Sequence, residues 1–219
     1  MLSYFDAHCD TLSRMAYLPG THLERRTGQW DLEKLSRFDG PKAQIFAVFC
    51  DSALPGASRA AERQIAVFRR ECERNQGRVV PCVDASQAEQ AFADGKLAAF
   101  LSVEGAELLD CAVEKLDWAY ARGVRFINLT WNHANALSGS HCDEPERGLS
   151  GQGRDFVRRM ERLGMLPDVS HLSDAGFWDL AECTNSPIIA SHSNSRSVFF
   201  HTRNLTDEQF TAIIKKNGM

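Results

Sequence analysis

Short apolar runs alternate with amphipathic segments along the chain, and this alternation limits the possible folds more than any other feature. Runs typical of buried strands are SYFDAH, AQIFAVFC, AAFLSVEG, VRFINLTW, MLPDVSH and PIIASHS, and RVVPCVDA predicts a further short strand outside this series. Strands that are apolar on both faces and separated by helices are typical of a parallel sheet covered by helices. We therefore expect an α/β fold.

Helix signals lie between several of these strands. The segment 57–77 carries apolar residues at helical spacing and ends at a glycine. Ser86 and Glu89 have the spacing of a capping box, and Thr206 and Gln209 repeat it near the end of the chain. The sequence therefore predicts helices in 57–77 and directly after each of these two caps.

Polar residues at the strand ends help to choose between the two common closures of this pattern, an open doubly wound sheet and a (β/α)8 barrel. In a barrel the chemistry lies at the carboxyl ends of the strands. Residue types that bind metals follow four separate strands here, at His8, Asp10, Glu104, His171 and His192. No glycine-rich nucleotide-binding loop follows the first strand. We expect one domain over residues 1–219 with a (β/α)8 TIM-barrel type of fold.

Composition excludes several classes of function. The formal net charge is −4 and basic residues form no stripe, so we expect no nucleic-acid partner. No apolar run approaches the roughly 20 residues that span a bilayer, so we expect no membrane association and a cytoplasmic protein. The seven cysteines are odd in number and form no C-x-x-C pair. We therefore expect reduced thiols and not a disulfide framework or a zinc knuckle.

The polar residues at the strand ends have the pattern of metal ligands. His8 and Asp10 are two positions apart, so on a strand both point to the same side. Glu104 ends an apolar run and precedes Gly105, which lets another group approach the backbone. Taken singly, a histidine at a strand end is often only hydrogen-bonded, and a buried glutamate is often paired with an arginine. Taken together, the residues favour a metal site.

Imidazole and carboxylate ligands without a thiolate suit zinc or a similar divalent ion. Because a carboxylate can bridge two ions, we expect Glu104 to be the bridge and the central catalytic residue. His8 and Asp10 would then hold one ion, and His171 and His192 the other. Such a site lowers the pKa of bound water, leaves room for a hydroxide between the ions, and polarises a carbonyl or phosphoryl oxygen. The cofactor expected from the sequence is a pair of Zn²⁺ ions.

Longer motifs resemble those of a known family. They are DAHCDTL, SVEGAELL, GVRFINLTWN, GLSGQGRDFVRRMERLGMLPDVSHLSD and PIIASHSNSRSV…TRNLTDEQ, and they resemble the membrane dipeptidase (renal dipeptidase) family, peptidase family M19, of the amidohydrolase superfamily. Most amidohydrolase barrels have H-x-H on the first strand, where this chain has Asp10 in place of the second histidine. The resemblance implies a binuclear zinc barrel whose ligands are the same five residues, and which cleaves dipeptides, tolerates a C-terminal D-residue and in some members opens β-lactams.

The resemblance also implies residues that bind the substrate. It assigns the terminal carboxylate of a dipeptide to Arg203, whose guanidinium can make a bidentate contact, whereas the sequence alone also allows a surface charge before a helix. Many relatives have a histidine directly after L-T on the fourth strand, where this chain has Trp131. His133 is a candidate for the same substrate contact, and a surface-loop histidine is the alternative.

The resemblance runs to the last residue, but the family barrel continues for two more strands, and an aspartate on the last strand is implied in proton transfer. This chain stops at KKNGM, and its 219 residues fall short of the roughly 250 typical of such barrels. We therefore expect a barrel that is truncated after about six strands. Its open edges would be covered in a homo-oligomer or by a C-terminal segment, without which dipeptidase activity would be weak or absent.

Three functions stay open from the sequence. The first is a zinc dipeptidase that acts on dipeptides through a hydroxide bridging the metals. The second is another binuclear metal hydrolase, such as a lactonase or a phosphoesterase, built on the same ligands. The third is an inactive truncated fragment that keeps the metal site.

Overall fold

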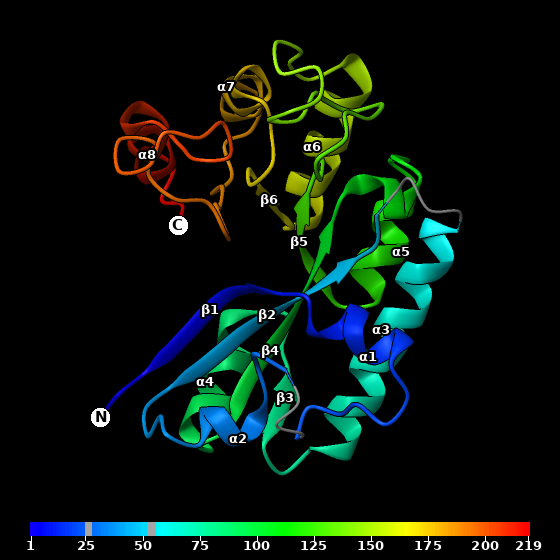
Figure 1. Ribbon diagram of the computed structural model, residues 1–219, viewed down its shortest axis with the longest axis vertical. Helices are drawn as coiled ribbons and strands as arrows, with labels where there is room; N and C mark the ends of the chain where they lie inside the picture. The colour runs from blue at the N-terminus through cyan, green and yellow to red at the C-terminus, as the bar shows by residue number, and fades with distance from the viewer. Residues whose placement is uncertain (25–27, 52–55) are drawn as a thin grey trace.

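The computed structural model describes residues 1–24, 28–51 and 56–219 (Figure 1). Within these residues, parallel strands form one sheet in the order β1-β2-β4-β5-β6, and β3 pairs with β4 off this path. The strands are β1 (Tyr4–Cys9), β2 (Lys42–Phe49), β3 (Val79–Pro81), β4 (Leu97–Glu104), β5 (Val124–Asn128) and β6 (Leu166–Asp168). The predicted α/β class with a parallel sheet is confirmed.

Helices lie in the connections between the strands, because a parallel strand can be reached only by a crossover, and α7 and α8 follow the last strand. They are α1 (Thr11–Tyr17), α2 (Leu32–Leu35), α3 (Ala57–Arg74), α4 (Ala85–Ala93), the 3-10 helix η1 (Ala106–Leu109), α5 (Lys115–Ala121), α6 (Gly151–Leu163), α7 (Asp174–Cys183) and α8 (Asp207–Lys215). The helix predicted in 57–77 is α3, which packs against α1 and η1. Each helix in the described residues is too short or too polar to cross a membrane.

The strand β4 is the centre of the sheet. It pairs along its whole length with β2, from Lys42 opposite Leu97 to Phe49 opposite Glu104. On its other side, β3 pairs with the first part of β4 and β5 with the last part, where Asn128 lies opposite Glu104. Glu104 is therefore held between two neighbouring strands, which fixes its backbone firmly.

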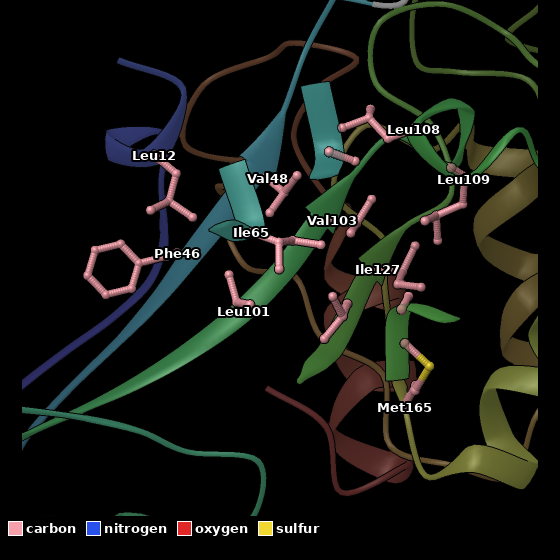
Figure 2. Close-up of a cluster of buried hydrophobic side chains, with 14 of the residues drawn as sticks. Leu12, Phe46, Val48, Ile65, Leu101, Val103, Leu108, Leu109, Ile127 and Met165 are labelled. Atoms are coloured by element: carbon pink, nitrogen blue, oxygen red, sulfur yellow. The ribbon is translucent and has the colours of Figure 1, made fainter. Parts of the chain in front are cut away.

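Apolar side chains from the sheet and the helices form the main core (Figure 2). Phe46 on β2, Leu101 on β4 and Ile127 on β5 are almost completely buried. Ile65 of α3 belongs to the same cluster and lies near them in Figure 2. Burial of each such side chain contributes about 1.5–3 kcal/mol. The core therefore makes the sheet a rigid platform for the residues at its carboxyl edge.

The strand predicted in 187–193 is wrong. This segment makes only an isolated parallel bridge between Ile189 and Asp168, with Ile189 N donating to Pro167 O at 3.0 Å. Beyond Ile189, side chains take the backbone amides that a ladder would use: Ser191 N donates to Asp168 Oδ1 at 3.2 Å and His192 N donates to Ser170 Oγ at 3.2 Å. The segment still lies beside β6, so it carries His192 to the same edge of the sheet.

Two local predictions have different outcomes. The strand predicted in RVVPCVDA is β3, and it belongs to the main sheet. The cap predicted at Ser86 is wrong, because Asp84 is the N-cap of α4 and accepts a hydrogen bond from Gln87 N at 2.9 Å. The capping box of Thr206 and Gln209 is confirmed at the start of α8.

Candidate metal centre

The carboxyl ends of the strands bring the predicted ligands together. His8 lies near the end of β1, Glu104 is the last residue of β4, and His171 follows β6 by a few residues. His192 follows the bridge that Ile189 makes with β6. Because parallel strands end at the same edge of a sheet, residues from distant parts of the chain converge there.

Glu104 is the centre of this cluster and is only 3% exposed. Its Oε2 lies 3.4 Å from His8 Nε2, whereas its Oε1 lies 2.9 Å from His171 Nε2 and 3.2 Å from His192 Nε2. The Nε2 atoms of His171 and His192 are 2.9 Å apart. The two oxygens of one carboxylate thus face different histidines.

Asp10 lies at the solvent side of the cluster. Its Oδ1 is 3.6 Å from His8 Nε2, and its side chain is 56% exposed. Asp10 precedes α1 at the N-cap position, but its side chain makes no capping hydrogen bond. The Asp10 carboxylate is therefore not bonded to the helix backbone and is available to bind a metal beside His8.

Burial and hydrogen bonds set the charges of these groups in opposite directions. Burial lowers the pKa of His8, but hydrogen bonds to Asp10 and Glu104 outweigh burial and raise the pKa to about 10. Burial raises the pKa of Glu104, but the hydrogen bonds with the three histidines outweigh burial and hold this pKa well below its usual range. Burial lowers the pKa of His171 to about 4, so its ring is neutral at pH 7. Glu104 is therefore ionised beside at least one neutral imidazole.

The cluster has the chemistry and the spacing of a divalent-metal site. Ligand atoms of His8, Glu104 and His192 all lie within 4.8 Å of one another. Tetrahedral zinc with bonds of about 2.0–2.1 Å would hold its ligand atoms about 3.3 Å apart. The contacts of Glu104 with the three rings, at 2.9 to 3.4 Å, are close to this separation. Nitrogen and carboxylate oxygen donors without sulfur also suit zinc.

Further polar residues hold the ligands, and the sequence analysis did not predict them. Asn132 Oδ1 lies 3.0 Å from His171 Nδ1, and Ser191 Oγ lies 2.7 Å from His192 Nδ1. Such partners on the second ring nitrogen orient a histidine that binds a metal. Ser191 could have been predicted as such a partner, because it directly precedes the candidate ligand His192. Asn132 could not, because it is distant in sequence from His171.

Asp168 joins the two segments that carry His171 and His192. It is the last residue of β6 and is 1% exposed. Its Oδ1 accepts hydrogen bonds from Ser170 N at 2.9 Å and from Ser191 N at 3.2 Å. The same oxygen therefore sets the spacing between the residues that precede the two ligands.

Arg203 lies close to the cluster and is half-buried. Its Nη1 donates a hydrogen bond to Ser193 Oγ at 2.9 Å, and Ser193 Oγ lies 3.2 Å from Ser170 Oγ, which accepts from His192 N. Burial lowers the pKa of Arg203, and the charges of Asp168 and Glu104 oppose this effect. The guanidinium is thus fixed near the ligand histidines by a short chain of serines.

His133 lies apart from the Glu104 cluster. Its side chain is 48% exposed, and its Nε2 lies 3.6 Å from Asp51 Oδ1. The ring of Trp131 is 5.7 Å from that of His133 and 6.3 Å from that of His171, measured between centroids. Trp131 therefore lies between the two rings, and within the described residues His133 makes its ring contact with Trp131 and its ion pair with Asp51, not with a predicted ligand.

A cavity of about 530 Å³ opens beside β1 and α1. Its lining includes the ligand candidates His8 and Asp10, together with Arg14, His22 and Trp30. This volume is in the range of small-molecule sites, roughly 300–1,000 Å³. The cluster is thus accessible to a small polar molecule from this side.

Histidines and a carboxylate at the carboxyl edge of a helix-covered parallel sheet are typical of metal-dependent hydrolases of the barrel class. The model of the membrane dipeptidase family, peptidase family M19, matches residues 1–219. The chain belongs to this family, and the resemblance seen in the sequence motifs is confirmed.

Two curated relatives show the extent of the similarity. An uncharacterized dipeptidase of Schizosaccharomyces pombe is 38% identical over 162 residues, which cover 71% of this chain and 38% of the relative. An uncharacterized protein in the pqqA 5′ region of Klebsiella pneumoniae is 35% identical over 163 residues, which cover 72% of this chain and 60% of the relative. The chain therefore spans less than two thirds of the length of these curated relatives.

A solved structure confirms the class of fold. The metallo peptidase from Rhodobacter sphaeroides, liganded with a phosphinate mimic of the dipeptide L-Ala-D-Ala, is 26% identical and matches with a TM-score of 0.89. The match covers 100% of this chain and 72% of that chain. The parallel sheet is therefore a half-barrel of the TIM-barrel type, as the sequence predicted.

Proposed function

We propose that residues 1–219 form one metallo-hydrolase domain that hydrolyses dipeptides with the help of two zinc ions. The observation that carries this proposal is the position of Glu104, whose two oxygens face His8 on one side and His171 and His192 on the other. Membership of the M19 family supports the same activity. The dipeptide mimic held by the Rhodobacter sphaeroides metallo peptidase supports a substrate with a C-terminal D-residue.

In this proposal the five predicted residues divide into two sets of ligands. His8 and Asp10 would hold one ion, His171 and His192 the other, and Glu104 would bridge both. When bound, the ions would lower the pKa of water and polarise the carbonyl of the scissile bond. Placement of Glu104 between β2 and β5 keeps its carboxylate in position, so the residues need little rearrangement to bind the ions.

The roles of the chain's own residues follow from their positions. Arg203 would bind the terminal carboxylate of the dipeptide, because a guanidinium fits a carboxylate with two parallel hydrogen bonds. The serine chain from Arg203 to His192 N fixes this contact relative to the ligands. A contact between His133 and the substrate stays a prediction, and its pairing with Asp51 gives it no support.

The proposed location and assembly rest on other features. All seven cysteines are free, which suits the reducing cytoplasm proposed for the protein.

The strand β1 lies at an edge of the sheet in the described residues, and such an edge favours pairing with another chain. We propose that a second copy or a further C-terminal segment covers it, and sedimentation velocity with and without that segment would distinguish the two.

The experiment compares substrate classes on zinc-loaded protein. Free L-L and L-D dipeptides, their C-terminal amides, a lactone and a phosphodiester are offered in parallel, before and after removal of metal with a chelator. We expect hydrolysis of free dipeptides that a chelator abolishes and zinc restores, with elemental analysis giving two ions per chain. Turnover of the lactone or the phosphodiester alone would replace the dipeptidase proposal, and zinc binding without turnover would identify a metal-binding protein without activity.

A further inference from the structure

We propose that Asn132 is a positioning residue that fixes the ring of His171 by accepting hydrogen bonds from two histidines at once. The proposal rests on the proposed function, because it requires a metal ion at His171. Asn132 lies in the loop between β5 and α6, and neither the resemblance nor the comparisons assign a role to this residue.

The geometry around the Asn132 amide carries the inference. Its Oδ1 lies 3.0 Å from His171 Nδ1 and 3.0 Å from His141 Nε2. A carbonyl oxygen has two lone pairs and no proton, so it can accept from both rings but cannot donate to either. A His171 ring that binds a metal through Nε2 would therefore carry its proton on Nδ1 and donate it to Asn132. Its Nε2 is the atom 2.9 Å from Glu104 Oε1 and faces the proposed metal site.

Asn132 is itself held in place. Its backbone carbonyl accepts hydrogen bonds from Ser140 Oγ at 2.7 Å and from Cys142 Sγ at 3.1 Å. His141, between those two residues, donates its backbone N–H to His171 O at 2.9 Å, and its Nδ1 lies 3.2 Å from Thr202 Oγ1. The amide oxygen is thus supported before any ligand binds.

His171 needs such support more than the other ligands do. It lies outside the strand and adopts φ 74°, a left-handed conformation that is uncommon for residues other than glycine. His192 has the hydroxyl of Ser191 on its Nδ1, and a hydroxyl can donate as well as accept. Only the amide oxygen of Asn132 requires one particular tautomer, so we expect its loss to affect the metal site directly.

The test measures zinc affinity by competition with a chromophoric chelator. Asn132→Leu removes the acceptor at similar size, and Asn132→Asp keeps an acceptor oxygen. We expect Asn132→Leu to weaken zinc binding about 10–100-fold, the usual effect of losing such a partner, and Asn132→Asp to stay within about three-fold of the wild type. His141→Phe is the matched control. It removes the other donor and leaves the bond to His171, so its zinc affinity should also stay within about three-fold.

A spectroscopic readout makes the test independent of how well the variants fold. In ¹⁵N-labelled wild-type protein loaded with zinc, His171 should bind the metal through Nε2, and its Nδ1–H should exchange slowly with water because Asn132 accepts it. Zinc bound through Nδ1, or an Nδ1–H that exchanges as fast as in free imidazole, would overturn the proposal. So would an Asn132→Leu variant that binds zinc like the wild type, or a loss in Asn132→Asp or His141→Phe as large as that in Asn132→Leu. Wild-type protein that binds no zinc would instead refute the proposed function.

Discussion

Gly105 follows Glu104 directly, and its replacement by alanine tests how the backbone positions the proposed bridging carboxylate. Gly105 has φ 89° and ψ 110°, a combination that residues with a Cβ rarely adopt. A Cβ built at this position would lie 2.7 Å from Glu107 Oε2. Both carboxylate oxygens of Glu107 are buried without a hydrogen-bond partner. The new methyl group would therefore push against a side chain that is already enclosed.

The magnitude has two parts. Forcing alanine into this backbone conformation costs about 1–3 kcal/mol. Displacing the Glu107 carboxylate adds on the order of 1 kcal/mol, as expected for an extra methyl group in a packed region. We expect Gly105→Ala to lower the free energy of unfolding by about 2–4 kcal/mol, a large share of the roughly 5–15 kcal/mol of a typical domain. Zinc bound per chain should fall as well, because Glu104 shifts with its neighbour.

Two other glycines separate these parts in urea unfolding of the metal-free protein. Gly95 has φ 70° but nothing within 4 Å of a built Cβ, so Gly95→Ala should show backbone strain alone, about 1–2 kcal/mol. Gly151, the first residue of α6, has free space and an ordinary φ. Gly151→Ala should be neutral or stabilising by up to about 1 kcal/mol. If Gly105→Ala is as stable as the wild type, the reasoning is refuted. If its loss of stability is no larger than that of Gly95→Ala, the clash with Glu107 makes no contribution.

Three further predictions concern charge. Glu104→Gln should lower the occupancy of both zinc ions together in elemental analysis, because the bridging charge is lost, and loss of one ion alone would count against bridging. Arg203→Lys should reduce the preference in kcat/KM for free dipeptides over their C-terminal amides, since an ammonium cannot make the bidentate contact, and an unchanged preference would return Arg203 to a surface role. The paired hydrogen bonds from Arg196 lower the pKa of Asp174. Its contribution to stability is therefore present above the unfolded pKa of about 3.9 and is lost as pH falls through the lower folded value. The difference in unfolding free energy between the wild type and Asp174→Asn should thus shrink below about pH 4, and a constant difference down to pH 2 would contradict it.

The sheet and the convergence of candidate ligands could be predicted because both depend on local patterns. Apolar runs such as the one that ends in Glu104 predict buried strands, and parallel strands must bring their ends together. The segment 187–193 has the same apolar start. The amides of Ser191 and His192 nevertheless donate to the side chains of Asp168 and Ser170, and a regular ladder does not form. The apolar start of the segment could predict where it lies, but not that side chains from another segment would take its amides.

The residues around the ligands could not be predicted, because their contacts join distant parts of the sequence. Asn132 and His171 are 39 positions apart, and their contact joins the segment after β5 to the segment after β6. The cap of α4 shows the same limit at short range. Ser86 and Glu89 have suitable spacing, but the N-cap lies two residues earlier, where Asp84 accepts a hydrogen bond from Gln87 N. The spacing of residues identifies candidate N-caps, but the residue at which the helix begins determines which candidate caps it.

The shared oxygen of Asp168 has a consequence for the dynamics of the site. Because this oxygen accepts from the amides of both Ser170 and Ser191, the two ligand segments cannot separate without breaking the hydrogen bond of Ser191 N to Asp168. Fluctuations that open the site should therefore involve His171 and His192 as one cooperative unit and not as two independently fraying loops. Exchange of a bound ion on that side would then follow the rate at which this unit opens, and a distant change that loosens β6 would speed the release of metal without touching a ligand.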